Sequence, residues 1–443
     1  MARGDAVSND RRDQDDSRNE LPNAAPEDLG VLRFLTCGSV DDGKSTLIGR
    51  LLFDTKALLS DTLAHLERNA QRRGLSALDL SLLTDGLVAE REQGITIDVA
   101  YRYFATVRRK FIIADSPGHV QYTRNMVTAA STADAAVLLV DARKGILAQT
   151  RRHATIAGLV GVRHLIVAVN KMDLVGFSPE RFADIVRQFR AWLAREPALH
   201  VQVDFIPLCA LDGANVVDRD ERLAWFAGPT LIELLERAPA HEADSQAPLR
   251  LPVQWVCRPS QSDFRGYAGR LESGSLAVGD EVRVFPSGRR SVVRSLAVGS
   301  LERDRAVAGQ SVLLSLADDI DVSRGDLLTK VSEDPLRESS RFEATVCWLG
   351  TQPLEAQREY LLLQATRQTR VRIGAVASHL NIESLQWERA GTQVQANDIV
   401  RLQLATQTPI AADDYERFRS IGSFILIDPA NNDTVAAGMI GAL

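Results

Sequence analysis

The chain has 443 residues, 45% of them hydrophobic and 25% charged, with a formal net charge of −6 at pH 7. This length exceeds what one hydrophobic core supports and indicates about two to four domains. No apolar run reaches the ~18–20 residues of a membrane span, and the acidic balance disfavours a protein that lives on nucleic acid, which usually carries a basic domain.

The first part of the chain, residues 1–29, is polar and charged and lacks the apolar core of a secretory signal. Because it offers little to bury, we expect a disordered tail. Cys37, Cys209, Cys257 and Cys347 lie far apart and form no C-x-x-C pair. Their spacing disfavours a zinc site and a disulfide framework and predicts a reducing, cytoplasmic location.

Residues 30–240 alternate short apolar runs with longer amphipathic stretches. The apolar runs predict buried strands at Val31–Cys37, Lys110–Ala114, Ala135–Asp141, His164–Asn170 and Val203–Leu208. Helical spacing is found at Lys44–Leu52, Gln121–Ala130, Gln149–Val160 and Pro179–Arg195. This alternation predicts an α/β domain with a mostly parallel sheet and helices on both faces.

The character of the sequence changes after a polar linker at His241–Pro248. Residues 247–333 contain short alternating segments separated by Gly, Pro, Asp and Ser, namely Arg250–Val256, Gly266–Glu272, Glu281–Phe285, Ser291–Ala297 and Gln310–Ser315. A second turn-rich region, Asp334–Ser340, leads into a further strand series that occupies residues 338–443. We therefore expect two all-β barrel domains after the α/β domain.

A phosphate-binding loop is predicted where the first strand ends. The segment Gly38–Ser45 matches G-x-x-x-x-G-K-[ST] and lies between a strand and a helix. Its backbone N–H groups and the helix N-terminus are suited to a β-phosphate. Lys44 is expected to reach the β- and γ-phosphates, and Ser45 to bind Mg²⁺. The residues predicted to hold the phosphates are Gly38, Ser39, Val40, Asp41, Asp42, Gly43, Lys44, Ser45 and Thr46.

Two later strand ends predict a guanine site. Asn170, Lys171 and Asp173 form an N-K-x-D motif, and the Asp173 carboxylate can accept hydrogen bonds from guanine N1–H and the 2-amino group. Adenine offers neither donor, so we expect ATP to be rejected by roughly 10⁴ or more. The segment Cys209–Ala210–Leu211 follows the next strand, where the Ala210 N–H would meet guanine O6.

The γ-phosphate side of the predicted site has four residues. Asp115 ends an apolar strand, where a carboxylate associated with Mg²⁺ belongs, and Gly118 would face the γ-phosphate. Thr96 would offer its hydroxyl to Mg²⁺ and its N–H to the γ-phosphate, which orders this loop only when a triphosphate is bound. A single histidine is more often structural, but the position of His119 directly after Gly118 favours a role in positioning the attacking water. The predicted catalytic residues are Lys44, Thr96 and His119.

Val40 and Ile95 are expected to form an apolar gate that keeps His119 away until a partner binds. Such a gate, together with the lack of any arginine finger identifiable from the sequence, predicts slow hydrolysis by the chain alone. Intact Thr96, Asp115 and His119 argue against a protein in which GTP is only a structural ligand.

These motifs, with the long insert Thr55–Gly94, resemble the translation-factor class of GTPases, in which two β-barrels follow the G domain. That class alone implies an elongation-factor-like carrier of aminoacyl-tRNA. A finer resemblance is to the GTPase (CysN-type) subunit of bacterial ATP sulfurylase, also called sulfate adenylyltransferase. It is carried by Arg33–Leu52, Gln121–Met126, Asp141–Gly145, Gln149–His153, Asp263–Gly269, Asp321–Asp326, Gly422–Asp428 and Ala437–Ile440. Asp42 favours this family, because elongation factors of the class usually carry histidine there.

The resemblance implies that GTP hydrolysis on this chain is coupled to an unfavourable reaction on a partner. The catalytic ATP sulfurylase (CysD-type) subunit of a hetero-oligomer makes adenosine 5′-phosphosulfate from ATP and sulfate. Some members carry a fused adenylylsulfate kinase, so the resemblance implies such a kinase as a fused or separate partner of this chain. Three residues differ from those common in relatives, namely Ser116, Val120 and Cys209. Val120 directly follows His119, the histidine predicted to position the attacking water.

Overall fold

The structure is a computed structural model that describes residues 29–57, 80, 99–117, 123–196, 199–240, 244–259, 264–355, 357–381, 384–389 and 393–441. The predicted N-terminal tail lies outside the described residues except for Leu29. Most of the insert Thr55–Gly94 also lies outside them. The predicted ranges 30–240, 247–333 and 338–443 each contain one large sheet, and we call the three units the G domain, barrel II and barrel III.

The G domain is built on a six-stranded sheet in the order β2-β3-β1-β4-β5-β6. Its strands are β1 Val31–Cys37, β2 Ala100–Ala105, β3 Lys110–Asp115, β4 Ala135–Asp141, β5 His164–Asn170 and β6 Gln202–Pro207. All neighbours are parallel except β2, which runs antiparallel to β3. The central strands β4 and β5 are buried along their whole length, as near-continuous apolar runs predict.

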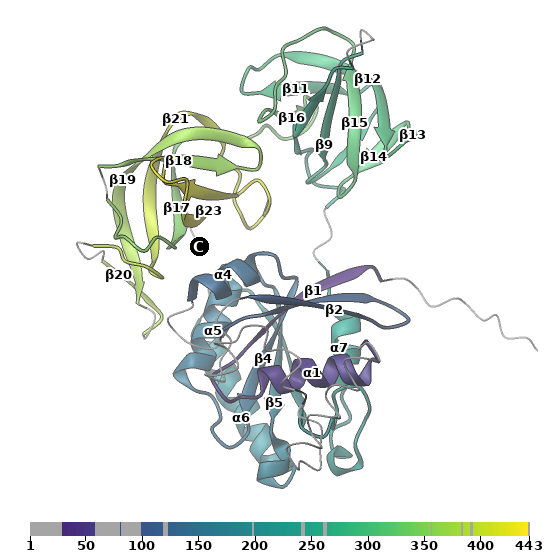
Figure 1. The fold of residues 1–443 in the computed structure, drawn as a ribbon, viewed down its shortest axis with the longest axis vertical. Coiled ribbons are helices and arrows are strands. Elements are labelled where there is room, and N and C mark those ends of the chain that lie inside the picture. The colour runs from purple at the N-terminus through teal and green to yellow at the C-terminus, as the bar shows by residue number, and fades with distance from the viewer. Residues whose placement is uncertain are drawn as a thin grey trace, which may run out of the picture.

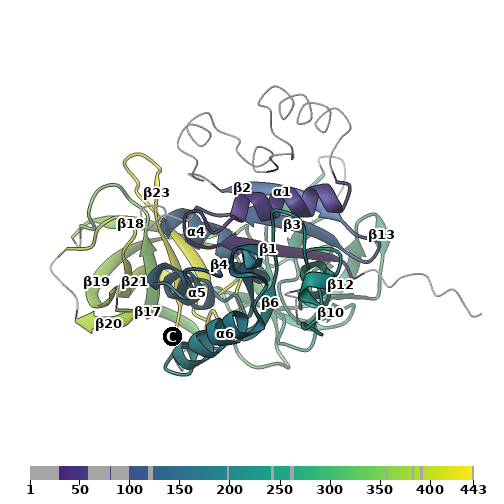
Figure 2. The same ribbon diagram turned by 90° about the horizontal axis from the view of Figure 1, so that it is seen from below.

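Helices cover both faces of this sheet (Figures 1 and 2). They are α1 Lys44–Asp54, α4 Thr123–Ser131, α5 Ala148–Leu159, α6 Pro179–Leu193 and α7 Leu231–Arg237, with short 3₁₀ turns η3 Met172–Val175 and η4 Glu221–Leu223. Helices α1 and α7 share a core with one face, and α4, α5 and α6 share a core with the other. The predicted α/β fold class is confirmed.

Barrel II contains an eight-stranded antiparallel sheet and a two-stranded one. Its strands are β7 Leu251–Pro252, β8 Trp255–Cys257, β9 Gly266–Arg270, β10 Ser275–Ala277, β11 Glu281–Phe285, β12 Arg290–Val298, β13 Leu301–Glu302, β14 Arg305–Val307, β15 Ser311–Leu316 and β16 Leu327–Lys330. The segment predicted as one strand, Arg250–Val256, is two strands that pair with different partners, β16 and β9.

Barrel III is a seven-stranded antiparallel sheet closed by pairing of β18 with β19. Its strands are β17 Glu338–Trp348, β18 Glu359–Gln364, β19 Arg367–Asn381, β20 Gln386–Arg389, β21 Ile399–Ala411, β22 Ser423–Ile427 and β23 Thr434–Ile440. Strand β17 begins inside the region predicted as turn-rich. The prediction of two all-β barrels after the α/β domain is confirmed. Among the described residues, no helix is long and apolar enough to cross a membrane.

Barrel III is joined to the G domain by the side chain of Arg419. Its guanidinium donates to the carbonyls of Ala130 at 2.9 Å and of Ala133 and Val160, both at 3.1 Å. Tyr415 adds a hydrogen bond of 2.7 Å to the Val160 carbonyl. Because these carbonyls lie at the C-terminal ends of α4 and α5, a cation there is electrostatically favoured.

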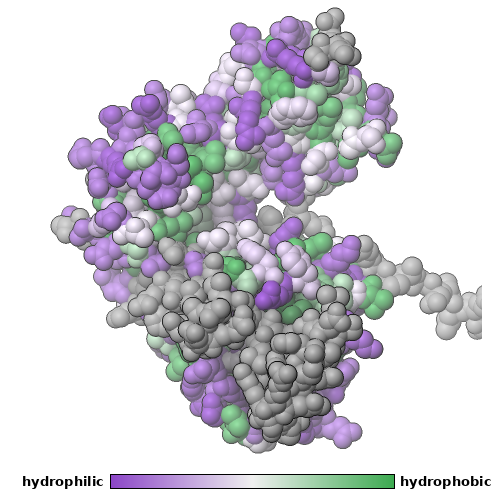
Figure 3. All heavy atoms as spheres, viewed as in Figure 1, coloured by the Kyte–Doolittle hydropathy of each residue, from purple (hydrophilic) through white to green (hydrophobic). Residues whose placement is uncertain are grey.

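The two barrels are joined by an ion pair that is almost fully buried. Arg250 Nε lies 2.6 Å from Asp413 Oδ2, and the side chains are 2% and 6% exposed. The guanidinium of Arg250 also lies over the ring of Phe418, 4.8 Å from its centroid. On the face shown in the space-filling view, an opening lies between barrel II and the G domain (Figure 3), and barrel III contacts both of these units.

Candidate nucleotide site

The predicted site residues that the structure describes meet at one edge of the G-domain sheet. The phosphate loop follows β1, Asp115 ends β3, Asn170 ends β5, and Cys209 lies just beyond β6. Because these strands are parallel, their carboxyl ends lie along the same edge, where open α/β sheets bind ligands. Thr96, Gly118 and His119 lie outside the described residues, as do Ile95 and Val120, so their predicted roles stay predictions.

The phosphate loop depends on two glycines that leave no room for a side chain. Gly43 has φ of +94°, and a Cβ there would lie 2.5 Å from Asn170 Nδ2. A Cβ on Gly38 would lie 3.0 Å from the carbonyl oxygen of Leu139 on β4. Asp41 between them also has positive φ, 69°. The loop is therefore wound tightly against β4 and β5, which is the shape that turns backbone N–H groups toward a phosphate.

Lys44 is the first residue of α1 and supplies the buried cation of the loop. The residue is 8% exposed, and its Nζ donates to the Gly38 carbonyl across the loop at 3.4 Å. Helix α1 has no side-chain cap and no acidic residue in its first turn. Its positive N-terminal pole is therefore not neutralised by the helix itself and favours an anion. Ser45 and Thr46 follow in the same turn and are partly exposed.

A buried histidine lies behind Lys44. His153 of α5 is 3% exposed and its Nε2 lies 2.9 Å from Gln149 Nε2. Burial, with Lys44 and Arg152 nearby, lowers the pKa of His153 to about 3, so the ring is neutral at physiological pH. The sequence places His153 in one of the segments that resemble the sulfurylase GTPases but gives no sign of this burial.

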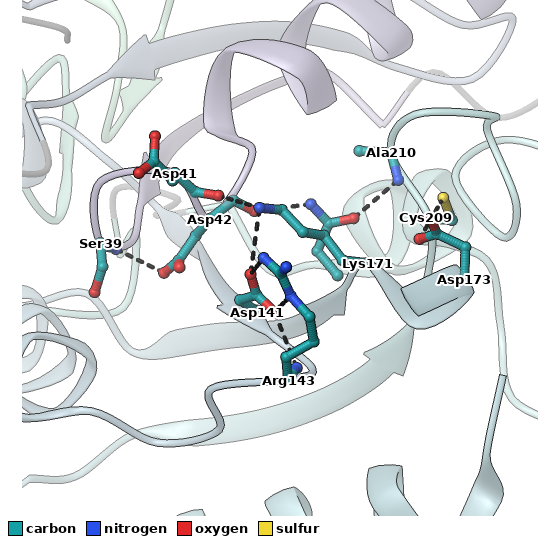
Figure 4. A network of polar contacts seen from close by, with 10 residues as sticks. Ser39, Asp41, Asp42, Asp141, Arg143, Lys171, Asp173, Cys209 and Ala210 are labelled. Atoms are coloured by element: carbon teal, nitrogen blue, oxygen red, sulfur yellow. Dashed lines mark hydrogen bonds and ion pairs between the residues drawn. The ribbon is translucent and has the colours of Figure 1, made fainter. Parts of the chain in front are cut away.

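A network of polar contacts connects the phosphate loop to the base-binding segment (Figure 4). The first connection is the side chain of Asn170. Its Nδ2 donates to the Asp42 carbonyl at 2.8 Å, and its Oδ1 accepts from the Ala210 N–H at 2.9 Å. The Ala210 N–H, predicted to meet guanine O6, therefore already has a partner. Asp173 Oδ1 accepts from the Cys209 thiol at 3.2 Å, and Leu211 beyond them is 66% exposed.

Lys171 forms a second connection between the two segments. Its ammonium donates to the Asp41 carbonyl of the phosphate loop and lies 3.2 Å from Asp141 Oδ2. Arg143 pairs with the same carboxylate at 2.7 Å. Burial raises the pKa of Asp141, but the hydrogen bonds from Arg143 and Lys171 outweigh it and hold that pKa well below its usual range. The segment Asp141–Gly145 was noted only for family resemblance, so sequence reasoning missed this anchor.

The γ-phosphate side retains two oxygen donors among the described residues. Asp115 is 2% exposed, and its Oδ1 accepts from the hydroxyl of Thr36 at 3.1 Å. The neighbouring Ser116 hydroxyl donates to the Thr36 carbonyl at 3.0 Å. Thr36, the residue before the last of β1, was not predicted as part of the site. The described residues predicted to bind Mg²⁺, Asp115 and Ser45, offer a carboxylate and a hydroxyl oxygen, and Mg²⁺ prefers oxygen ligands.

Comparison with known proteins decides the family. Residues 30–242 match the family described as "Elongation factor Tu GTP binding domain", and residues 341–441 match "GTP-eEF1A C-terminal domain-like". "Sulfate adenylyltransferase subunit 1" of Aeromonas hydrophila is 49% identical over 418 residues, which are 94% of this chain and 87% of that protein. The chain belongs to the sulfate adenylyltransferase subunit 1 family.

Other matches show how the family extends. The "Bifunctional enzyme CysN/CysC" of Mycobacterium tuberculosis is 49% identical over 415 residues, which are 93% of this chain and 67% of that protein. A solved structure of sup35 complexed with GMPPNP is 25% identical, covers 96% of each chain and has a TM-score of 0.43, too low to bear on the assignment. The relatives and the matching GTP-binding domain favour the sulfate adenylyltransferase family, and the expectation of an elongation-factor-like carrier is not supported.

Proposed function

We propose that this chain binds GTP with Mg²⁺ and that its hydrolysis of GTP drives formation of adenosine 5′-phosphosulfate from ATP and sulfate on a separate catalytic subunit. The proposal rests on one observation in a chain of this family, namely the bridge that the Asn170 side chain forms between the two ends of the site. One side chain holds the phosphate loop at Asp42 and the base segment at Ala210. A nucleotide bound at one end would therefore meet a preorganised contact surface at the other.

Guanine selectivity is proposed to come from Asp173. Its carboxylate has one oxygen occupied by the Cys209 thiol, and burial raises the pKa of that thiol to about 12, which keeps it a neutral donor. A guanine base would bring two N–H donors to the carboxylate, whereas adenine would bring none. Leaving a desolvated carboxylate unpaired costs several kcal/mol, which supports roughly 10⁴-fold selectivity against ATP.

Mg²⁺ is proposed to be held by the Ser45 and Thr96 hydroxyls, with Asp115 oriented toward it by Thr36. When bound, the metal neutralises charge on the β- and γ-phosphate oxygens. Lys44 is proposed to contact the same oxygens and to stabilise the charge that develops during transfer of the phosphoryl group to water. His119 is proposed to position that water, behind a gate formed by Val40 and Ile95.

The partner is proposed to be the catalytic ATP sulfurylase (CysD-type) subunit in a hetero-oligomer. The words "subunit 1" in the names of the relatives support a partner subunit, and the bifunctional relative supports an adenylylsulfate kinase as a fused or separate partner. We propose a cytoplasmic location. Its support is the thiol state of Cys37, Cys209, Cys257 and Cys347, which are all free.

The test is to purify the chain with and without the catalytic subunit and to measure GTP hydrolysis and adenosine phosphosulfate formation together. We expect the partner to accelerate hydrolysis and GTP to increase product formation. A rate of GTP hydrolysis that does not change with the partner, or a rate of product formation that does not change with GTP, would overturn the proposed coupling.

The role of His119 is tested by His119→Ala, with His200→Ala as the matched control because His200 is exposed and outside the site. We expect His119→Ala to lower partner-stimulated hydrolysis by about two orders of magnitude, the usual loss for a positioned proton-handling group. GTP affinity should be nearly unchanged in both variants. A collapse of affinity in His119→Ala alone would make that residue structural.

A further inference from the structure

The carboxylate of Asp42 folds back onto its own phosphate loop and is shielded from solvent. The residue is 2% exposed, and Oδ2 accepts from the Ser39 N–H at 2.7 Å. The other oxygen, Oδ1, is buried and has no hydrogen-bond partner among the described residues. An ionised carboxylate with an unpaired buried oxygen is costly, whereas the neutral acid is less so. The carboxylate therefore lies in surroundings that favour its protonation.

The charged groups around Asp42 come from three elements. Lys44 faces it from the start of α1, Lys144 from the turn after β4, and Asp141 from the end of β4. Burial is the largest influence and raises the pKa of Asp42 to about 6, although the Ser39 N–H and both lysines oppose this and Asp141 reinforces it. Asp42 is thus ionised at neutral pH in the nucleotide-free protein, but close to the pH at which it titrates.

The remaining neighbours of the loop hold its backbone. The neutral Asn170 amide holds the Asp42 carbonyl, and the Lys171 ammonium holds the Asp41 carbonyl. His153 behind Lys44 is neutral near pH 7. A triphosphate bound by the same loop would add several negative charges close to this carboxylate. A nearby like charge disfavours ionisation of a carboxylate.

We propose that Asp42 is a positioning residue that takes up a proton from solvent on Oδ1 when a nucleoside triphosphate occupies the loop, so that GTP binding is linked to protonation. The neutral acid still offers Oδ2 to the Ser39 N–H, so the loop keeps its shape while the charge that repels the phosphates is removed. This inference rests on the proposed function, because it requires that the loop binds a triphosphate.

The sign of the effect follows from the two states. Asp42 titrates near pH 6 in the free protein and at a higher pH in the complex. Affinity should therefore rise as pH falls from above the titration point of the complex to about pH 6, and should level off below it. If binding raises the pKa of Asp42 by one unit, the affinity gain is about fivefold by pH 6 and approaches tenfold below it.

The test compares wild type, Asp42→Asn and Asp304→Asn. Asparagine at position 42 keeps the shape and the acceptor for Ser39 but cannot titrate. Asp304 is the control, because it is an exposed aspartate of barrel II that lies outside the nucleotide site. The dissociation constant of a non-hydrolysable GTP analogue with Mg²⁺ is measured from pH 6 to 8.5. The titration of the nucleotide itself is common to all three proteins.

We expect wild type and Asp304→Asn to gain about fivefold more affinity between pH 8.5 and pH 6 than Asp42→Asn does. Equal pH dependence in all three proteins would overturn the inference. If Asp42→Asn does not fold, calorimetry of wild type in buffers of different ionisation enthalpy counts the protons directly. Uptake no greater than the protonation change of the nucleotide would then overturn it. Loss of analogue binding by folded wild type would instead refute the proposed function.

Discussion

The phosphate end and the base end of the site are built in different ways. At the phosphate end, the shape comes from the backbone, with Gly43 at φ +94° and Gly38 closely packed on β4. At the base end, the shape comes from side chains, since Asn170 and Asp173 hold Ala210 and Cys209. Substitutions should therefore act through sterics at one end and through lost hydrogen bonds at the other.

The largest effect is expected from Asp173→Asn at the base end. The change replaces an acceptor by an amide that can donate, so guanine loses its partner for the 2-amino group. Xanthine, with a carbonyl at that position, gains one. We expect the preference for GTP over xanthosine triphosphate to fall by roughly 10⁴. Competition binding with the two nucleotides measures this, and an unchanged preference would remove Asp173 from base recognition.

The next largest effect is expected from Gly43→Ala at the phosphate end. The new Cβ would meet Asn170 Nδ2 at 2.5 Å and would strain the backbone at φ +94°. Strain of about 1–3 kcal/mol, together with displacement of Asn170, should lower GTP affinity by at least about tenfold.

Gly176→Ala is the matched control for Gly43→Ala. Gly176 also has a positive φ, +63°, but a Cβ added there would have nothing within 4 Å. It should lower the thermal stability slightly and leave affinity unchanged. Equal affinity losses in the two variants, measured by nucleotide titration, would contradict the steric explanation.

Asn170→Ala tests whether the two ends depend on each other. It removes the partners of the Asp42 carbonyl and the Ala210 N–H. Each unsatisfied buried group costs about 1–3 kcal/mol, part of which relaxation recovers. We expect GTP affinity to fall about tenfold, with looser discrimination among bases.

Asn170→Asp separates the two arms of this bridge, since it keeps the acceptor for Ala210 but loses the donor to Asp42. It should weaken phosphate binding and preserve base selectivity. If pyrophosphate competition and base selectivity fell together in this variant, the two arms would not be separable.

The smallest effect is expected from Cys209→Ser. The hydroxyl keeps a donor toward Asp173, and a change of this kind should cost less than about 1 kcal/mol in nucleotide affinity. Cys209→Ala, which removes the donor, serves as the comparison and should cost more. Isothermal titration with GDP distinguishes them. If Cys209→Ser were the more harmful variant, packing rather than the hydrogen bond would explain this residue.

The sheet was predictable because its pattern is strong. Buried runs such as Ala135–Asp141 and His164–Asn170 have the same bounds in the sequence and in the structure. Strand β2 was not predicted because it lies at an antiparallel edge of the sheet and every second residue is exposed. Tyr101 and Tyr103 are two of these exposed residues. Helix α7 was not predicted because it is only seven residues long. The sequence signal that could have found it is the capping box formed by Thr230 and Glu233.

The site was predictable as a set of motifs but not as a network. Motif spacing assigns residues to strand ends, which is sufficient to bring Lys44 and Asn170 to one edge. It does not specify which side chain joins which backbone group, because many rotamers reach from a given strand end. The bridge from Asn170 to Ala210, the anchoring of Lys171 by Asp141, and the burial of Asp42 all come from such choices.

The joint at Arg419 has a mechanical consequence. Helix α4 is nine residues long, about 14 Å. Its first turn follows the segment after Asp115, and its last turn supplies the Ala130 carbonyl to Arg419. Helix α4 is therefore one rigid connection between the γ-phosphate side and barrel III, and the Val160 carbonyl at the end of α5 provides a second contact. Because the ion pair of Arg250 with Asp413 links barrel II to barrel III, a tilt of α4 would act on both barrels together.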